Sequence, residues 1–237
     1  MLLLRSLRRA TTALSSVRSF SVTSQAATIP FTSCVNLQSN CSSSFPLYSF
    51  LNDSLFMFPC LDDNYGFILK PSSSSPNLLL IDSPDGDRYL NVISHITKHI
   101  SKHSSSPPAL TLLNTHHHWD HTQGNAAILD KYPNTKIYSP DASIHGTTDL
   151  LDPTDLPASF SPPSLPALSI VPLDTSGHTT SHLSYSIPAL SLFFAGDALF
   201  SLGCGRIFEG TAAMSFKGLQ NIRDRVGEDA WLCCAHE

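Results

Sequence analysis

Short apolar runs bounded by turn-forming or polar residues alternate with amphipathic segments along the chain from residue 77 onward. A short apolar run of this kind predicts a buried β-strand, and apolar residues at helical spacing predict an α-helix with one buried face. The predicted strands are NLLLIDSP (77–84), ALTLLNT (109–115), KIYSP (136–140), LSIVPLDT (168–175), LSYSI (183–187), LSLFFAGD (190–197) and AWLCCAHE (230–237). The predicted helices are RYLNVISHITKHI (88–100), GNAAILDKY (124–132) and TAAMSFKGLQNIRDRV (211–226).

Strands outnumber helices in this pattern, and the two kinds are interleaved. Interleaved strands and helices predict a layered α/β architecture, with either two sheets or one large mixed sheet. Ser/Pro-rich patches interrupt the apolar segments without dividing them into separate cores, so we interpret them as surface loops. We therefore expect one folded domain over residues 53–237.

The first 52 residues differ from the rest of the chain. They contain four arginines and many Ser and Thr residues, and the first acidic residue is Asp53. This composition is typical of an organelle transit peptide, which is disordered for most of its length. Because the arginines recur at near-helical spacing, we expect the mitochondrial matrix, with a plastid as the alternative, and an ordinary disordered tail is the competing interpretation.

The net charge of residues 53–237, the hydropathy and the cysteine spacing disfavour several classes of protein. The net charge is −5 and the four leader arginines contribute +4, so residues 53–237 carry −9. A strongly acidic body disfavours nucleic-acid binding. No run of about eighteen apolar residues occurs, so we expect no membrane span. The six cysteines show no C-x-x-C spacing, and we expect all six to be free thiols, with adjacent Cys233 and Cys234 on opposite faces of a strand.

Four of the predicted strands end directly in residues that bind metals. Loops that follow strands in layered α/β folds gather at one rim of the sheet, so these four strand ends predict one shared site. The first strand end is the sequence THHHWDH, in which ionisable groups are crowded together. Such crowding is unfavourable unless a cation holds them. The seven candidate ligands are His116, His118, Asp120, His121, His178, Asp197 and His236.

The number of candidate ligands predicts two metal ions. Five His and two Asp are too many for one tetrahedral zinc, but they suit two ions of four or five ligands that share a carboxylate. His116 and His118 project to the same side of an extended segment and can bind one ion, whereas Asp120 and His121 continue to a second. We expect His117 to face away, in a role of packing or of supporting a ligand, and Trp119 to lie in the wall of the site.

The other histidines have no such support. His95, His99 and His103 lie at helical spacing beside lysines, which is typical of a solvated helix face. His145 and His182 are isolated in the sequence, and we interpret them as surface or supporting residues.

Several motifs together resemble one enzyme family. THHHWDH, TSGHT, GDALFSLGCGRIFEGT, CCAHE and PCLDDNY are similar to sequences of the glyoxalase II (hydroxyacylglutathione hydrolase) family within the metallo-β-lactamase superfamily. The resemblance implies a four-layer αββα sandwich. It also implies two divalent ions, zinc first and iron or manganese as alternatives, with His116, His118 and His178 on one, Asp120, His121 and His236 on the other, and Asp197 bridging both.

The resemblance implies hydrolysis of S-(2-hydroxyacyl)glutathione thioesters, chiefly S-D-lactoylglutathione to D-lactate and glutathione, in methylglyoxal detoxification. A hydroxide held by two ions would attack the thioester, with Asp120 and Asp197 as the catalytic carboxylates. The thiolate, whose conjugate acid has a pKa of about 8.5, can leave without a general acid. We expect a monomer whose partner is this small thioester.

Arg206 and Phe208 match positions that contact glutathione in the family, although Phe208 lacks the hydroxyl found in some members and Arg206 could instead be a loop-packing cation. Family members continue past the last histidine into a helical domain, so we expect a C-terminally truncated catalytic domain. Two alternatives stay open, namely a mononuclear-iron glutathione persulfide dioxygenase and an inactive metal-binding remnant.

Overall fold

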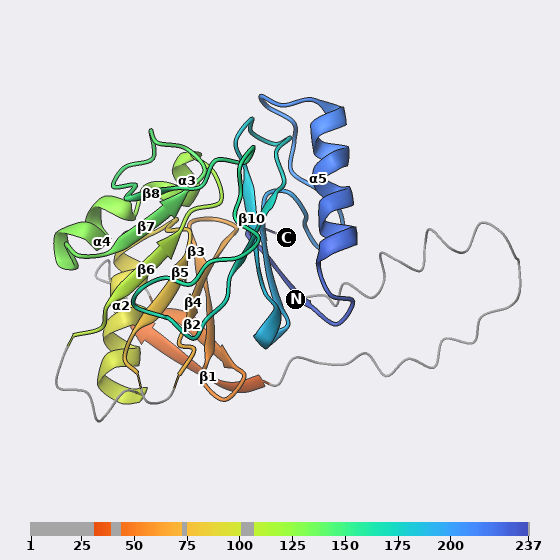
Figure 1. The fold of residues 1–237 in the computed structure, drawn as a ribbon. Coiled ribbons are helices and arrows are strands. Elements are labelled where there is room, and N and C mark those ends of the chain that lie inside the picture. Colours follow the sequence, from red (N-terminus) through yellow and green to blue (C-terminus); the bar gives the residue numbers. More distant parts are fainter. Residues whose placement is uncertain (1–30, 39–43, 73–74, 101–106, 237) are drawn as a thin grey trace, which may run out of the picture.

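The computed structural model describes residues 31–38, 44–72, 75–100 and 107–236. They form two sheets that pack face to face, with helices on both outer faces (Figure 1). The larger sheet has the strand order β1 (Phe31–Gln38), β2 (Ser44–Phe50), β3 (Leu55–Cys60), β4 (Asn64–Leu69), β5 (Leu78–Ile81), β6 (Leu110–Leu113), β7 (Lys136–Ser139) and β8 (Asp149–Leu150). The smaller sheet has the order β12 (Trp231–Cys234), β11 (Leu192–Gly196), β10 (Leu183–Ile187) and β9 (Val171–Asp174).

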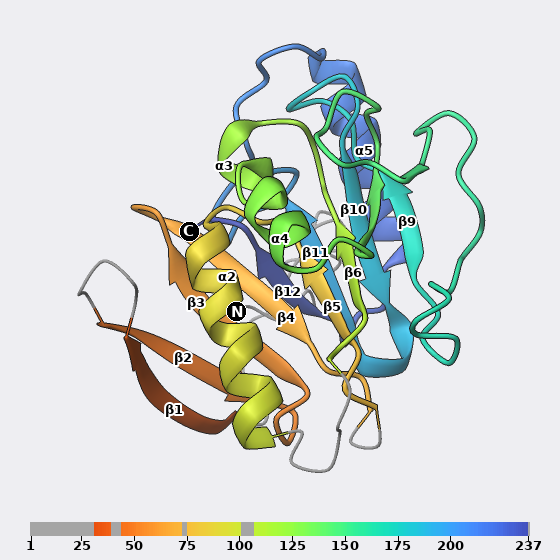
Figure 2. The same cartoon turned by 90° about the vertical axis from the view of Figure 1, so that its left-hand side faces the viewer.

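The helices complete two further layers. On the outer face of the larger sheet lie α2 (Gly86–His95), which continues as the π-helical turn η2 (Ile96–Ile100), and α4 (Asn125–Lys131), as Figure 2 shows. On the outer face of the smaller sheet lies α5 (Ala212–Arg225). Two short helices, α3 (Trp119–Thr122) and the 3-10 turn η3 (Pro188–Leu190), lie in the connections. The fold is therefore the predicted four-layer αββα sandwich, and no described helix is long and apolar enough to cross a membrane.

Alternating side chains hold the layers together. Successive residues of a strand point to opposite faces, so a fully apolar strand fills two cores at once. In β4, Phe67 and Leu69 enter the core between the sheets, whereas Ile68 packs under α2. In β12, Cys233 enters the core between the sheets and Cys234 packs under α5, which confirms their predicted placement on opposite faces. The five cysteines whose side chains are described, namely Cys34, Cys60, Cys204, Cys233 and Cys234, are free thiols.

Strand direction brings the predicted strand ends together. Strands β5 to β8 run parallel to one another, so the polar segment that follows β6 leaves the same sheet edge as the ends of its neighbours. In the smaller sheet, β11 is parallel to β12 and antiparallel to β10, which is antiparallel to β9. The carboxyl ends of β9, β11 and β12 therefore also share one edge. The Leu183 N–H donates to the Thr115 carbonyl and joins this edge to the end of β6.

The predicted domain start at residue 53 lies too late in the chain. Strand β2 pairs with both β1 and β3, and its residues Phe45, Leu47 and Ser49 are buried. The sequence SFPLYSF alternates buried and more exposed positions, which is the pattern of a strand with one covered face. The folded part thus includes residues 31–38 and 44–50, which the sequence analysis assigned to the leader. Residues 1–30 and 39–43, on which the rest of that prediction depends, lie outside the described residues.

Candidate metal centre

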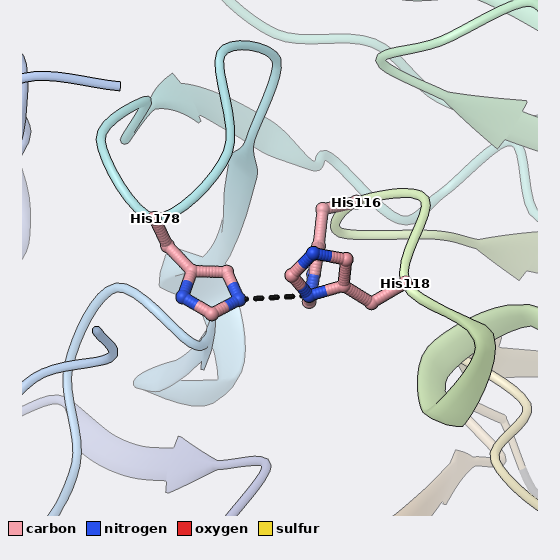
Figure 3. Close-up of side chains that lie close together, drawn as sticks. All are labelled: His116, His118 and His178. Atoms are coloured by element: carbon pink, nitrogen blue, oxygen red, sulfur yellow. Dashed lines mark hydrogen bonds between the residues drawn. The ribbon is translucent and has the colours of Figure 1, made fainter. Parts of the chain in front are cut away.

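Three histidines from two separate loops form the first ligand set. His116 and His118 follow β6, and His178 follows β9 (Figure 3). One ring nitrogen from each lies within 4.8 Å of the others, and His178 Nε2 is 2.9 Å from His118 Nδ1. His116 and His178 are buried, whereas His118 is half-buried. These residues are the three that the sequence analysis grouped on one ion.

A second set lies beside the first. Asp120 and His121 belong to α3, and His236 follows β12. Asp120 Oδ2 is 3.6 Å from His121 Nε2 and 3.5 Å from His236 Nε2, and the two ring nitrogens are 3.4 Å apart. His121 is fully buried, and the side chain of His236 is 13% exposed. The structure therefore also brings together the three residues that were grouped on the second ion.

Asp197 lies between the two sets and presents one carboxylate oxygen to each. Its Oδ2 is 3.3 Å from His178 Nε2 in the first set. Its Oδ1 is 3.3 Å from His121 Nε2 and 3.5 Å from His236 Nε2 in the second. All seven predicted ligands thus converge, and the predicted bridging residue occupies the position from which a carboxylate can bridge.

The spacing and the chemistry of these atoms fit divalent cations. Ligand atoms about 2.0–2.1 Å from a tetrahedral zinc lie roughly 3.3 Å from one another, which is close to the separations above. Buried polar atoms in proteins are almost always hydrogen-bonded. Here His116 Nε2 and Asp197 Oδ1 are buried and make no hydrogen bond within the described part of the chain. Imidazole and carboxylate donors suit zinc, iron and manganese.

The electrostatics of the ligand sets depend on how burial and charge compete. Burial, followed by the nearby ring of His121, lowers the pKa of His116 well below its usual value. Burial also disfavours the charged form of His121, but the carboxylates of Asp82 and Asp197 outweigh it and raise the pKa of His121 to about 10. Burial tends to raise the pKa of Asp197, yet the surrounding histidines lower it. Asp197 is therefore a carboxylate that can attract cations at neutral pH.

Asp82 is a candidate supporting residue that the sequence patterns did not identify. It follows β5, is buried, and accepts hydrogen bonds from His121 Nδ1 at 2.8 Å and from the Thr115 N–H and hydroxyl at 2.7 and 2.9 Å. By accepting the hydrogen bond from His121 Nδ1, it orients the ring so that Nε2 faces Asp197 and the second set. The signal was present, because NLLLIDSP also ends an apolar strand with an aspartate.

The turn between β3 and β4 fixes the position of His236. The Tyr65 N–H donates to the Ala235 carbonyl at 2.8 Å. His236 Nδ1 lies 3.2 Å from Asp63 Oδ1, and the Asn64 amide lies 3.3 Å from both His236 Nε2 and Asp120 Oδ2. The PCLDDNY segment therefore supports the second ligand set.

The predicted substrate residues line the outer side of the first set. The Phe208 ring packs edge-on against His118 and His178, with ring centroids 5.5 and 5.3 Å apart, and is 58% exposed. The Arg206 guanidinium lies 5.2 Å from the centre of the Phe208 ring, and the Arg206 carbonyl accepts from His178 Nδ1 at 2.6 Å. The side chains of Arg206 and Phe208 are accessible to a ligand, and the Arg206 backbone orients a predicted metal ligand.

His117 and Trp119 lie outside the two ligand sets, although the His117 ring is beside that of His118. His117 Nε2 is 3.0 Å from Glu209 Oε1, whose other oxygen accepts from the Thr180 N–H and hydroxyl. One donor atom each from His117, His118 and Glu209 also lie within 4.8 Å of one another on the more exposed side. Trp119 is 65% exposed at the start of α3, so its predicted place in the wall of the site stays a prediction. The turn after His118 directs this side chain outward while it directs His121 inward.

Comparison with known proteins agrees with this geometry. The family model described as "Metallo-beta-lactamase superfamily" matches residues 107–231, which contain six of the seven converging ligands. The chain belongs to the metallo-β-lactamase superfamily. Among solved members of this superfamily, BLEG-1 B3 metallo-β-lactamase has a TM-score of 0.61 at 16% identity, covering 76% of this chain and 90% of that one. A metallo-β-lactamase from Erythrobacter litoralis has a TM-score of 0.62 at 16% identity, covering 81% of this chain and 89% of that one. At such low identity these structures show the fold alone.

Curated superfamily relatives share more sequence with the chain. A hydroxyacylglutathione hydrolase from Erwinia tasmaniensis is 35% identical over 191 residues, and one from Erythrobacter litoralis is 32% identical over 198 residues. These matches cover 78% and 77% of this chain, respectively, and 66% of each relative. The chain thus spans slightly less than two thirds of the length of these curated relatives.

Proposed function

We propose that this protein is a metal-dependent hydrolase of S-(2-hydroxyacyl)glutathione thioesters, with S-D-lactoylglutathione as its chief substrate in methylglyoxal detoxification. The names of the curated relatives support the substrate class. The observation that carries the proposal is the position of Asp197, which directs one oxygen to each of two neighbouring ligand sets. A residue in this position suits two divalent cations, with zinc favoured by the histidine-rich donor set.

When two such cations are bound, they supply a hydroxide nucleophile at neutral pH and polarise the thioester carbonyl. The chain itself supplies the orientation. Asp82 and the Arg206 carbonyl accept hydrogen bonds from His121 Nδ1 and His178 Nδ1, so both Nε2 atoms face inward. Phe208 provides an apolar wall beside the first set, and the exposed Arg206 offers a guanidinium to a substrate carboxylate.

The test is hydrolysis by the full chain after it has been loaded with zinc. We expect two zinc ions per chain, and loss of thioester absorbance when S-D-lactoylglutathione is added. The variant Asp197→Asn should lose at least one ion and most of its activity, because it removes a negative charge that faces both sets. Binding of two zinc ions without thioester hydrolysis would contradict the substrate, and binding of fewer than two would contradict the dinuclear centre.

A matched control is available on the surface of the molecule. His99 is exposed on η2, where its ring contacts His95 at 4.8 Å between centroids, outside the seven converging ligands. His121→Ala should lose zinc and activity, because it removes a member of the second set. His99→Ala also removes an imidazole, but its zinc content and activity should stay at the wild-type level. Equal losses in both variants would show that the zinc is bound nonspecifically.

We also propose that residues 1–30 contain a mitochondrial targeting signal and that the protein acts as a monomer. The four arginines at near-helical spacing and the absence of acidic residues before Asp53 support the first point. Residues 1–30 fused to a fluorescent protein should direct it to mitochondria, and accumulation of the fusion in plastids would contradict this.

The proposed monomer has a separate test. Light scattering of the purified protein should give the mass of a single chain.

A further inference from the structure

A histidine that does not belong to the seven converging ligands lies directly beneath Asp197. His182 is fully buried, and its ring lies 4.9 Å from the ring of His116 between centroids. The backbone N–H of Asp197 donates to His182 Nε2 at 3.2 Å. A backbone N–H is always a donor, so His182 Nε2 must be the unprotonated nitrogen of a neutral ring.

The remaining contacts of His182 agree with this tautomer. With Nε2 as the acceptor, the ring proton is on Nδ1, which lies 2.8 Å from the Thr175 hydroxyl. The Thr175 hydroxyl lies 2.9 Å from the Ser184 hydroxyl, and the Ser184 hydroxyl donates to the Ala195 carbonyl at 2.9 Å. All donors in this row can therefore point in one direction, from Asp197 through His182, Thr175 and Ser184 to the backbone of β11.

The backbone before Asp197 is shaped around the same ring. Gly196 has φ +54°, a left-handed conformation that favours glycine. A Cβ at this position would lie 2.9 Å from His182 Nε2 and 2.8 Å from Thr115 Cβ. The chain thus turns tightly over His182 just before Asp197, and the hydrogen bond from the Asp197 N–H fixes the end of that turn.

We propose that His182 is a positioning residue that holds Asp197 between the two ligand sets. It binds no ion itself, because both of its nitrogens are engaged by Asp197 and Thr175. Asp197 must direct its two oxygens to different sets, so a small rotation of its backbone would withdraw one of them. The inference rests on the metal-binding part of the proposed function and is independent of the substrate.

Three variants test which contact of His182 matters. His182→Gln places an amide oxygen near the position of Nε2 and can still accept from the Asp197 N–H. His182→Asn places its polar atoms near Nδ1 and can reach only Thr175, and His182→Leu can make neither contact. Competition with a chelator should show zinc affinity within about threefold of wild type for Gln. It should show a loss of about 10- to 100-fold for Asn and Leu, which is typical when a residue supporting a ligand is removed.

A purely structural role for His182 would give a different order of zinc affinities among the three variants. If His182 only fills space, zinc affinity should follow the thermal stability of the metal-free variants, and Leu should bind zinc as tightly as Gln. That result would overturn the proposal while leaving the dinuclear centre intact. A wild-type protein that fails to bind two ions would instead contradict the proposed function.

A measurement on the wild-type chain makes the test independent of how the variants fold. In a ¹⁵N-labelled sample we expect His182 to have its proton on Nδ1. We also expect a scalar coupling between His182 Nε2 and the Asp197 amide nitrogen. A proton on Nε2 of His182, or no coupling to Asp197, would also overturn the proposal.

Discussion

The strongest test of how the second ligand set is oriented is the replacement of Asp82 by asparagine. Asp82 has φ +51°, and Asn tolerates this left-handed conformation better than most residues, so the backbone should stay in place. The carboxylate accepts three hydrogen bonds, two on Oδ2 from His121 Nδ1 and the Thr115 hydroxyl, and one on Oδ1 from the Thr115 N–H. Asparagine keeps an acceptor oxygen at only one of these two positions and has an NH₂ donor at the other.

Each orientation of the amide disrupts at least one of these contacts, and an NH₂ group in place of Oδ2 faces both His121 Nδ1 and the Thr115 hydroxyl. If the NH₂ group faces His121, Nδ1 must become an acceptor and the proton moves to Nε2, the atom that faces Asp197. If the NH₂ group faces the Thr115 N–H instead, two donors meet in a buried site, which costs about 1–3 kcal/mol of folding free energy. We expect zinc in the second set to bind about 10- to 100-fold more weakly, equivalent to about 1.4–2.8 kcal/mol.

The assay is a chelator competition that measures both binding constants. In Asp82→Asn the zinc ion in the second set should be lost first, while the ion in the first set keeps an affinity near that of the wild type. Asp87→Asn is the control, because Asp87 is exposed on α2 and its replacement removes the same charge. Two zinc constants within twofold of wild type in Asp82→Asn, with an unchanged free energy of unfolding, would refute the assigned role of Asp82.

Three further outcomes follow from the same contacts. Removing the ions with a chelator should lower the melting temperature, because the ions bind the folded chain, and adding zinc back should restore it; an unchanged melting temperature would mean that the ligand sets are empty in the purified protein. Burial lowers the pKa of His182 to about 3, below the value of about 6.5 in the unfolded chain, so the unfolded state binds the extra proton. As the pH drops below about 6.5, His182 alone should therefore lower the free energy of unfolding of the metal-free protein by about 1.4 kcal/mol per pH unit. Denaturant melts at several pH values should show a smaller slope in His182→Gln. Phe208→Ala should raise KM more than it lowers kcat, since the ring is exposed and contacts two ligands only by its edge, and a change in kcat alone would contradict its role as a substrate wall.

The convergence of the ligands could be predicted from the sequence because each of four strands is an apolar run that stops at a polar residue. This pattern located His178 and Asp197 at strand ends without any knowledge of how the strands pair. Strand direction then decides the outcome, since β9, β11 and β12 have their carboxyl ends at one edge. The sequence indicated which residues meet, and the topology supplied the reason.

The N-terminal strands were harder to predict because local composition hides their role. Residues 44–50 contain two serines and a proline, and they follow a segment rich in arginine and serine. Only the pairing of β2 with β3 shows that Phe45 and Leu47 belong to the core between the larger sheet and α2. A half-covered strand of mixed composition resembles a polar leader until its partner strand is known.

The supporting residues could not be distinguished by type or spacing, and their burial explains why. His182 and His145 are both isolated histidines in the sequence, but His182 is fully buried and His145 is exposed. Asp82 contacts His121, which is 39 positions away, and His182 contacts Asp197, which is 15 positions away. A buried polar group must find a partner, and in this fold those partners are the ligands themselves. The residues beneath the metal centre therefore couple its geometry to the packing of both sheets, so that replacing them should change ion affinity more than it changes the fold.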